Sequence, residues 1–251
     1  MNKNELIKMI NDNLDDDISI ENIINELDNY ICLLTEQNSE IIEQCIEEDP
    51  KYSDVLSPII EPLGIYKNHS SCETISQKLD KNILEELVWK IAVENSIQGK
   101  NPEVKTYIAD YVLGLGIRFY ERLKDGEWEL VEEMEHHVYN EGGEKRHECS
   151  WCSKVCKYLH EALFDEDKYY IYDSNVKNRF NDYRKYYGLS QTSKKSIDVK
   201  NTPDGWYRNL YNSLDELRQN RADNGESLTR NKLDHILWGF AKYKVEVARV
   251  R

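Results

Sequence analysis

Residues that interrupt helices are scarce in this sequence, and so are long apolar runs. Its 251 residues include only 5 prolines and 11 glycines, so few positions force the chain out of a helix. No run of 18 apolar residues occurs, which excludes an ordinary transmembrane helix. The N-terminus, MNKNELIKMINDNLDDD, lacks the apolar core of a signal peptide. We therefore expect a cytoplasmic protein that does not enter a membrane.

Three common catalytic motifs are also absent. The chain has no nucleotide-binding glycine-rich loop, no G-x-S-x-G nucleophile elbow and no H-E-x-x-H zinc motif. Gly114 and Gly116 form a G-x-G pair, but they fall inside an apolar, tyrosine-rich stretch. We expect this pair to permit close helix packing rather than to bind phosphate.

Positive charge is scarce in the first third of the chain and common in the last. Residues 1–80 hold 18 acidic and 5 basic residues, a net charge of −13 within the chain's −14. Residues 174–232 hold 12 basic and 7 acidic residues, a net charge of +5. The acidic N-terminal helices therefore indicate a protein partner or a purely structural role. The last third is suited to face phosphates.

Six cysteines are present, and in a cytoplasmic chain we expect reduced thiols. Cys149, Cys152 and Cys156 form a C-x-x-C-x-x-x-C run, which with His147 and His160 is compatible with zinc or an iron–sulfur cluster. We favour another interpretation, in which Cys152 and Cys156 are small buried hydrophobes on one helix face. On this basis we expect no metal and no other cofactor.

Apolar residues recur at helical spacing along almost the whole chain, which predicts a mostly α fold. Prolines at positions 50, 58 and 62 interrupt the pattern. We therefore expect an acidic helical extension at residues 1–62 and a second domain at residues 63–251. The expected helices cover residues 4–14, 20–35, 38–48, 74–97, 102–124, 127–139, 150–164, 174–187, 206–223 and 228–245.

A lysine and an aspartate stand out in the stretch from Glu148 to Phe180. Lys154 lies near the start of an expected helix, and Asp173 follows 19 residues later, where Asp173 and Ser174 cap the next helix. A helix, a turn and a second helix bring the two helix starts together, which predicts that Lys154 and Asp173 share one cleft. A solvated lysine and an aspartate that only caps a helix are also compatible with this spacing.

This arrangement resembles the helix-hairpin-helix DNA glycosylases, in particular a bacterial branch similar to 8-oxoguanine DNA glycosylase. In that family a lysine at the start of the second hairpin helix attacks the sugar, and an aspartate about 19 positions later completes the site. Lys154 and Asp173 match this pair. The segments around them, SKVCKYLH and YYIYDSNV, also match the family's sequence, and LDHILWGFAK is similar to its closing helix. The resemblance spans roughly residues 85–245. It implies a glycosylase-like domain at residues 63–251 that binds DNA and acts in base-excision DNA repair.

The resemblance also implies roles for individual residues in removing a modified or damaged purine, with or without AP-lyase activity. The amine of Lys154 would attack the anomeric carbon, and the carboxylate of Asp173 would stabilise the positively charged sugar. A base that leaves the stack needs an aromatic pocket, for which the candidates are Trp151, Tyr172 and Trp238. The candidates for contact with the DNA backbone are Ser150, Ser153, Arg179, Arg184 and Lys185.

The attack requires Lys154 without its proton, although an ordinary lysine has a pKa of about 10.4. Burial and nearby cations both favour the neutral amine. Lys145, Arg146 and Lys157 are close in sequence and Trp151 is able to exclude water, so these four residues are the expected source of both effects.

The sequence departs from the family at the hairpin itself. The family has Leu-Pro-Gly-x-Gly just before the lysine, and these glycines grip a DNA phosphate and a cation. The corresponding positions here are Cys149, Ser150, Trp151 and Cys152, without a glycine. This departure favours an alternative function, a non-catalytic protein of the same fold that acts as a binding or regulatory module. An unrelated helical interaction protein is a third interpretation.

Overall fold

The computed structural model describes residues 33–47, 56–94, 101–143, 147–164 and 166–238. Within these ranges no residue lies in a β-strand, and the predicted mostly α fold is confirmed. The helices expected at residues 4–14 and, for the most part, 20–35 lie outside the described residues. The longer helices are α3 (Glu36–Glu47), α6 (Lys81–Glu94), α7 (Pro102–Leu115), α8 (Ile117–Asp125), α9 (Glu129–Glu141), α10 (Cys149–Phe164), α11 (Ser174–Tyr186) and α12 (Trp206–Asp223).

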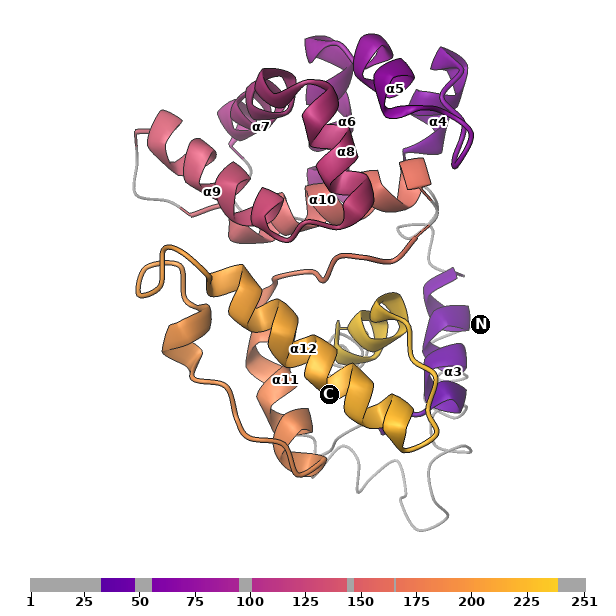
Figure 1. Cartoon of the computed structure of the whole chain (residues 1–251), viewed down its shortest axis with the longest axis vertical. Helices are drawn as coiled ribbons and strands as arrows, with labels where there is room; N and C mark the ends of the chain where they lie inside the picture. The colour runs from indigo at the N-terminus through magenta and orange to yellow at the C-terminus, as the bar shows by residue number, and fades with distance from the viewer. Residues whose placement is uncertain (1–32, 48–55, 95–100, 144–146, 165, 239–251) are drawn as a thin grey trace, which may run out of the picture. The chain divides into compact units, whose positions relative to one another are not determined.

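The described residues form two compact units (Figure 1). The central unit comprises Ser53–Asp173 and Thr192–Ser213, and the terminal unit comprises Met1–Tyr52, Ser174–Gln191 and Leu214–Arg251. By contact, the described part of the acidic N-terminal segment thus belongs with the last part of the chain. The division into an extension and a catalytic domain at residue 62 stays a prediction.

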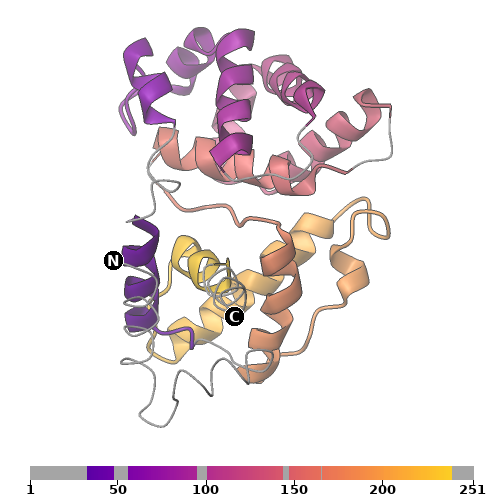
Figure 2. The same cartoon turned by 180° about the vertical axis from the view of Figure 1, so that it is seen from behind.

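The central unit is a group of helices that pack around α10. This helix contacts α6, α8 and α9, and α7 in turn packs on α6 and α9 (Figure 2). Short helices precede this group: α4 (Ser57–Ile60), the 3₁₀ helix η2 (Glu61–Leu63) and α5 (Cys72–Lys78), which packs on α8. The apolar faces meet in a core with fully buried side chains such as Leu87, Ile108, Phe119, Met134 and Val155.

Two expected helices are each divided in two. The helix expected at 74–97 breaks at Leu79 and Asp80, where the Asp80 carboxylate accepts a hydrogen bond from the amide of Ile83 (3.0 Å) and so begins α6. The helix expected at 102–124 breaks at Gly116, whose φ of 57° and ψ of −132° interrupt the helical backbone. The packing role expected for the G-x-G pair is wrong, because a Cβ added to Gly114 would meet nothing within 4 Å.

In the terminal unit, α3 contributes to a shared core rather than standing apart. The amide of Leu34 donates to the hydroxyl of Tyr187 (2.8 Å), and the amide of Glu36 donates to the carboxylate of Glu226 (2.7 Å). Leu34 and Ile42 are buried, as are Phe180, Leu217 and Leu233 from α11, α12 and the helical residues 230–238. The apolar face of the described N-terminal segment therefore helps to complete the core of this unit.

Candidate active site

Helices α9 and α10 form the hairpin on which the candidate site is built. Helix α9 ends at Glu141, where Gly142 donates its amide to the carbonyl of Val138 (2.9 Å) and Gly143 takes a φ of 64°. Such a left-handed residue is a common way to stop a helix, because glycine adopts it without strain. The chain then returns as α10, which packs against α9. The helix expected at residues 127–139 thus ends two residues later than predicted.

One hydrogen bond joins the residues that directly precede the two predicted catalytic positions. The hydroxyl of Ser153 accepts from the amide of Tyr172 (3.0 Å) and donates to the carbonyl of Ser150 (3.1 Å). Lys154 and Asp173 are the residues that directly follow Ser153 and Tyr172. The bond therefore joins the second turn of α10 to the chain just before α11, across the same 19-residue interval that separates the predicted pair.

The two members of the pair differ in their exposure. Lys154 is only 7% exposed and lies on the part of α10 whose neighbouring residues are all buried. Lysine is almost never fully buried unless its ammonium group is compensated. Asp173 is half-buried and immediately precedes the first residue of α11. Both residues take part in further interactions within the protein.

Residues 166–173, which lead into α11, are non-helical and held at several points. The amide of Tyr170 donates to the hydroxyl of Tyr207 (3.1 Å), and that hydroxyl donates to the carbonyl of Tyr170 (2.7 Å). The hydroxyl of Tyr172 donates to the carbonyl of Ile197 (2.9 Å). This run, residues 169–173, is therefore fixed at Tyr170 and Tyr172, directly before Asp173.

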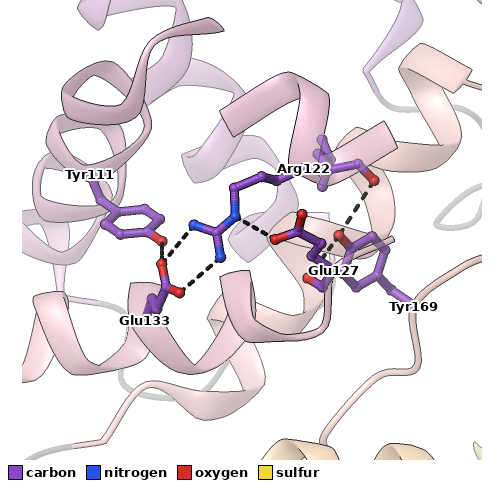
Figure 3. A network of polar contacts seen from close by, with 6 residues as sticks. Tyr111, Arg122, Glu127, Glu133 and Tyr169 are labelled. Atoms are coloured by element: carbon purple, nitrogen blue, oxygen red, sulfur yellow. Dashed lines mark hydrogen bonds and ion pairs between the residues drawn. The ribbon is translucent and has the colours of Figure 1, made fainter. Parts of the chain in front are cut away.

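A network around Arg122 supports the start of this run (Figure 3). The guanidinium of Arg122 makes two hydrogen bonds to the carboxylate of Glu133 (2.8 Å each) and one to Glu127 (2.6 Å). Tyr111 donates its hydroxyl to Glu133 (2.9 Å), and Tyr169 donates to the carbonyl of Glu127 (3.2 Å). Arg122 and Tyr111 hold the pKa of the Glu133 carboxyl below its usual range. The network ties α7, α8 and α9 to the run before Asp173.

Of the three cations expected to surround Lys154, the structure describes Lys157. Lys157, also buried, pairs with the carboxylates of Glu161 (3.0 Å) and Asp167 (3.7 Å). Its charge is thereby compensated locally. Lys157 is therefore a weak source of the repulsion that was predicted to favour the neutral amine of Lys154. Lys145 and Arg146 lie outside the described residues.

The predicted base-pocket aromatics are mostly part of the protein core. Trp151 is fully buried, and its indole nitrogen donates to the carbonyl of Val88 (3.2 Å). Tyr172 lies edge-on against Trp206, with ring centroids 4.7 Å apart, and burial raises the pKa of its phenol. Trp238 is half-buried in the terminal unit. A role of these rings in holding a flipped base stays a prediction.

The predicted DNA-backbone residues fall into two groups. Ser153 and Arg184 are buried, and Arg184 is engaged with Glu216 (2.6 Å) and with the carbonyl of Ser190 (2.8 Å). These internal contacts disfavour a phosphate role for both side chains. Lys185 is exposed, whereas Ser150 and Arg179 are half-buried and Arg179 also pairs with Asp182 (3.7 Å). A phosphate contact by these three residues stays a prediction.

The cysteine run behaves as the hydrophobic interpretation predicts. Cys149, Cys152 and Cys156 are buried thiols, and burial raises the pKa of both Cys152 and Cys156. In the part of the chain that the structure describes, no three His, Cys, Asp or Glu side chains form a group able to hold a metal ion. His147 instead bonds the buried carboxylate of Glu135 through Nδ1 (2.6 Å) and stacks on Tyr139, with centroids 4.4 Å apart.

A second long-range contact was not predicted from the sequence. The carboxylate of Glu132 accepts hydrogen bonds from the amides of Gly205 (2.8 Å), Tyr207 (2.7 Å) and Arg208 (3.1 Å). These amides surround the first turn of α12, where a negative charge is favourable. Burial raises the pKa of Glu132, and the three amides act against that rise. Glu132 is therefore committed to capping α12.

Comparison with known proteins gives no relative for this chain. No protein-family model, no curated protein and no solved structure matches it. None of the helices in the described ranges is long and apolar enough to cross a membrane.

Proposed function

We propose that this protein is a DNA N-glycosylase that removes a modified or damaged purine, with Lys154 as nucleophile and Asp173 as the stabilising carboxylate. The observation that carries the proposal is the hydrogen bond from the amide of Tyr172 to the hydroxyl of Ser153, which joins the residues directly before Asp173 and Lys154. The packed α9–α10 hairpin and the burial of Lys154 give further support.

The reaction follows from the two functional groups. The neutral amine of Lys154 forms a bond to the anomeric carbon, and the glycosidic bond breaks as the base leaves with its electron pair and gains a proton. The carboxylate of Asp173 stabilises the positive charge that develops on the sugar. Ring opening then gives a Schiff base between lysine and sugar, which borohydride reduces to a stable amine. Burial of an amine disfavours its ammonium form, as the attack requires.

Borohydride trapping on duplexes with a single damaged purine tests the proposal. The wild-type chain should form a covalent adduct, Lys154→Gln should form none, and Asp173→Asn should form it more slowly while remaining folded, because Asn is also a good helix cap. Lys157→Gln is the matched control, since it removes a second buried lysine of the same helix. An adduct of undiminished yield with Lys154→Gln would assign the chemistry to another residue.

A non-catalytic protein of the same fold is the second candidate. The observations that favour it are the lack of glycine at positions 149–152 and the complete burial of Trp151, which leaves that ring no surface for a base. Duplex binding without any adduct, for every damaged purine tried, would support this candidate against the enzyme.

A further inference from the structure

A lysine-rich segment of the central unit contacts the residue that precedes Asp173. This segment, residues 192–202 and here called the η3 segment, contains the 3₁₀ helix η3 (Lys194–Ile197). Its carbonyl at Ile197 accepts the hydrogen bond from the hydroxyl of Tyr172 (2.9 Å). Tyr172 is also the residue whose amide bonds Ser153. One tyrosine thus links the η3 segment to both halves of the proposed active site.

The backbone of the η3 segment is fixed at three consecutive carbonyls. Besides Ile197, the carbonyl of Ser196 accepts from the side-chain amide of Asn209 (2.8 Å), and that of Lys195 accepts from the hydroxyl of Thr202 (3.1 Å). Ile197 is fully buried and anchors the segment on the unit's core. A backbone held in this way loses little further conformational freedom when it binds a ligand.

The η3 segment exposes positively charged side chains to solvent. Lys194, Lys195 and Lys200 are all exposed, and none of them forms an ion pair with any residue that the structure describes. The carboxylate of Asp198 accepts from the amide of Lys200 (3.1 Å) and the side chain of Asn201 (2.9 Å), so it shapes the turn. In contrast, Lys81, Lys157 and Lys168 of the same unit each pair with a carboxylate.

We propose that the η3 segment binds the phosphate backbone of the DNA strand whose damaged nucleotide enters the site at Lys154 and Asp173. This inference rests on the proposed function. The lysine ammonium group binds phosphate as a mobile point charge. Three lysines on a fixed backbone next to the site can therefore contact successive phosphates of one strand. The hairpin has no glycine at positions 149–152 to hold a phosphate, so the η3 segment takes over this task.

Salt-dependent binding of the full-length chain tests this assignment. The η3 variant carries Lys194→Ala, Lys195→Ala and Lys200→Ala, and the control variant carries Lys67→Ala, Lys81→Ala and Lys124→Ala. The control removes three exposed lysines elsewhere in the same unit, so both variants have the same net charge. The probe is a fluorescein-labelled duplex with one tetrahydrofuran abasic analogue, which has no glycosidic bond and does not react. Fluorescence anisotropy gives the dissociation constant at a series of salt concentrations.

The η3 variant should lose affinity by about tenfold or more at low salt. The slope of log affinity against log salt should fall by roughly 2–3, since each phosphate contact contributes about 0.9. The control should retain the wild-type slope. Equal slopes for the two variants would overturn the assignment, and so would tighter binding of a single-stranded RNA through the same lysines.

Borohydride trapping separates a failure of this assignment from a failure of the proposed function. A wild-type chain that forms the adduct, together with an η3 variant of unchanged slope, overturns the phosphate assignment alone. A wild-type chain that neither binds the probe nor forms an adduct overturns both.

Discussion

The two halves of α10 each bury a lysine, and the surroundings of the two lysines differ. In the second half Lys157 pairs with Glu161 and Asp167, and the nearby His160 packs edge-on against Tyr169 (5.5 Å between centroids). In the first half Ser153, the residue before Lys154, is joined by one hydrogen bond to the chain that leads into Asp173. Burial of a lysine alone therefore does not identify a reactive group. We propose a structural role for the second half and a catalytic role for the first.

The largest effect on stability should come from Lys157→Met. This change leaves the carboxylates of Glu161 and Asp167 without the cation that compensates them, and breaking such a pair costs about 3 kcal/mol. Urea denaturation at neutral pH measures this loss. The yield of borohydride adduct per folded molecule should remain that of the wild type. A loss of adduct formation in a variant that is still folded would place Lys157 in the reactive half and remove the distinction.

A smaller change in stability, with a clear effect on the reaction, is expected for Ser153→Ala. The variant leaves the buried amide of Tyr172 without its acceptor, which costs about 1–3 kcal/mol. It also loosens Asp173 relative to Lys154, and a displacement of about 1 Å lowers a reaction rate roughly 100-fold. Single-turnover trapping kinetics measure the rate. Ser153→Thr retains the hydroxyl and serves as the control, which should restore most of the rate. Wild-type kinetics for Ser153→Ala would show that this bond does not position the pair.

The smallest effect is a change in pH dependence caused by Glu133→Gln in the Arg122 network. The folded-state pKa of Glu133 is depressed, so its contribution to stability is present above the ordinary carboxyl pKa of about 4.3 and is lost as the pH falls through the folded-state value. The difference in unfolding free energy between wild type and variant should thus be largest at neutral pH and shrink in acid. Denaturation midpoints at several pH values provide the measurement. A difference that is independent of pH would show that the ion pair with Arg122 contributes nothing.

Local signals were sufficient for much of the fold. Asn101 caps α7, since its side chain accepts from the amide of Glu103 (3.0 Å) and Pro102 occupies the first turn. The glycines at 142 and 143 end α9, and Cys152 and Cys156 lie buried on one helix. Each of these features depends on residues within one or two turns of one another, which is why the sequence pattern predicts them.

The features that sequence reasoning missed depend on pairs distant in the chain. Glu132 caps a helix that begins 74 residues later. In the sequence it is only one of several acidic residues that would be expected on a solvent-exposed helix face. Arg122 likewise has the sequence pattern of a solvent-exposed residue. In the structure it binds two carboxylates, one from the next helix and one from the turn before that helix. Gly116 was expected inside a helix, because a positive φ cannot be recognised from a single glycine in an apolar stretch. No local pattern specifies these partners.

The candidate site could be predicted from the sequence only in part. The interval between Lys154 and Asp173 was read directly from the sequence, but the contacts that set the positions of the two residues were not. The hydroxyl of Ser153 and the phenol of Tyr172 were assigned to a DNA phosphate and to a base pocket, yet both bond to the protein backbone. Side chains next to a reactive pair are often engaged in holding it, and only tertiary structure distinguishes this task from ligand contact.

The most direct test of the account is to locate the attachment site of the trapped sugar. After borohydride trapping on a duplex with one damaged purine, protease digestion and tandem mass spectrometry identify the modified lysine. If Lys154 is the nucleophile, it should be the single modified residue, with the buried Lys157 three residues later unmodified. Attachment at Lys157 or at an exposed lysine such as Lys195, or the absence of any adduct on all damaged purines tested, would contradict it.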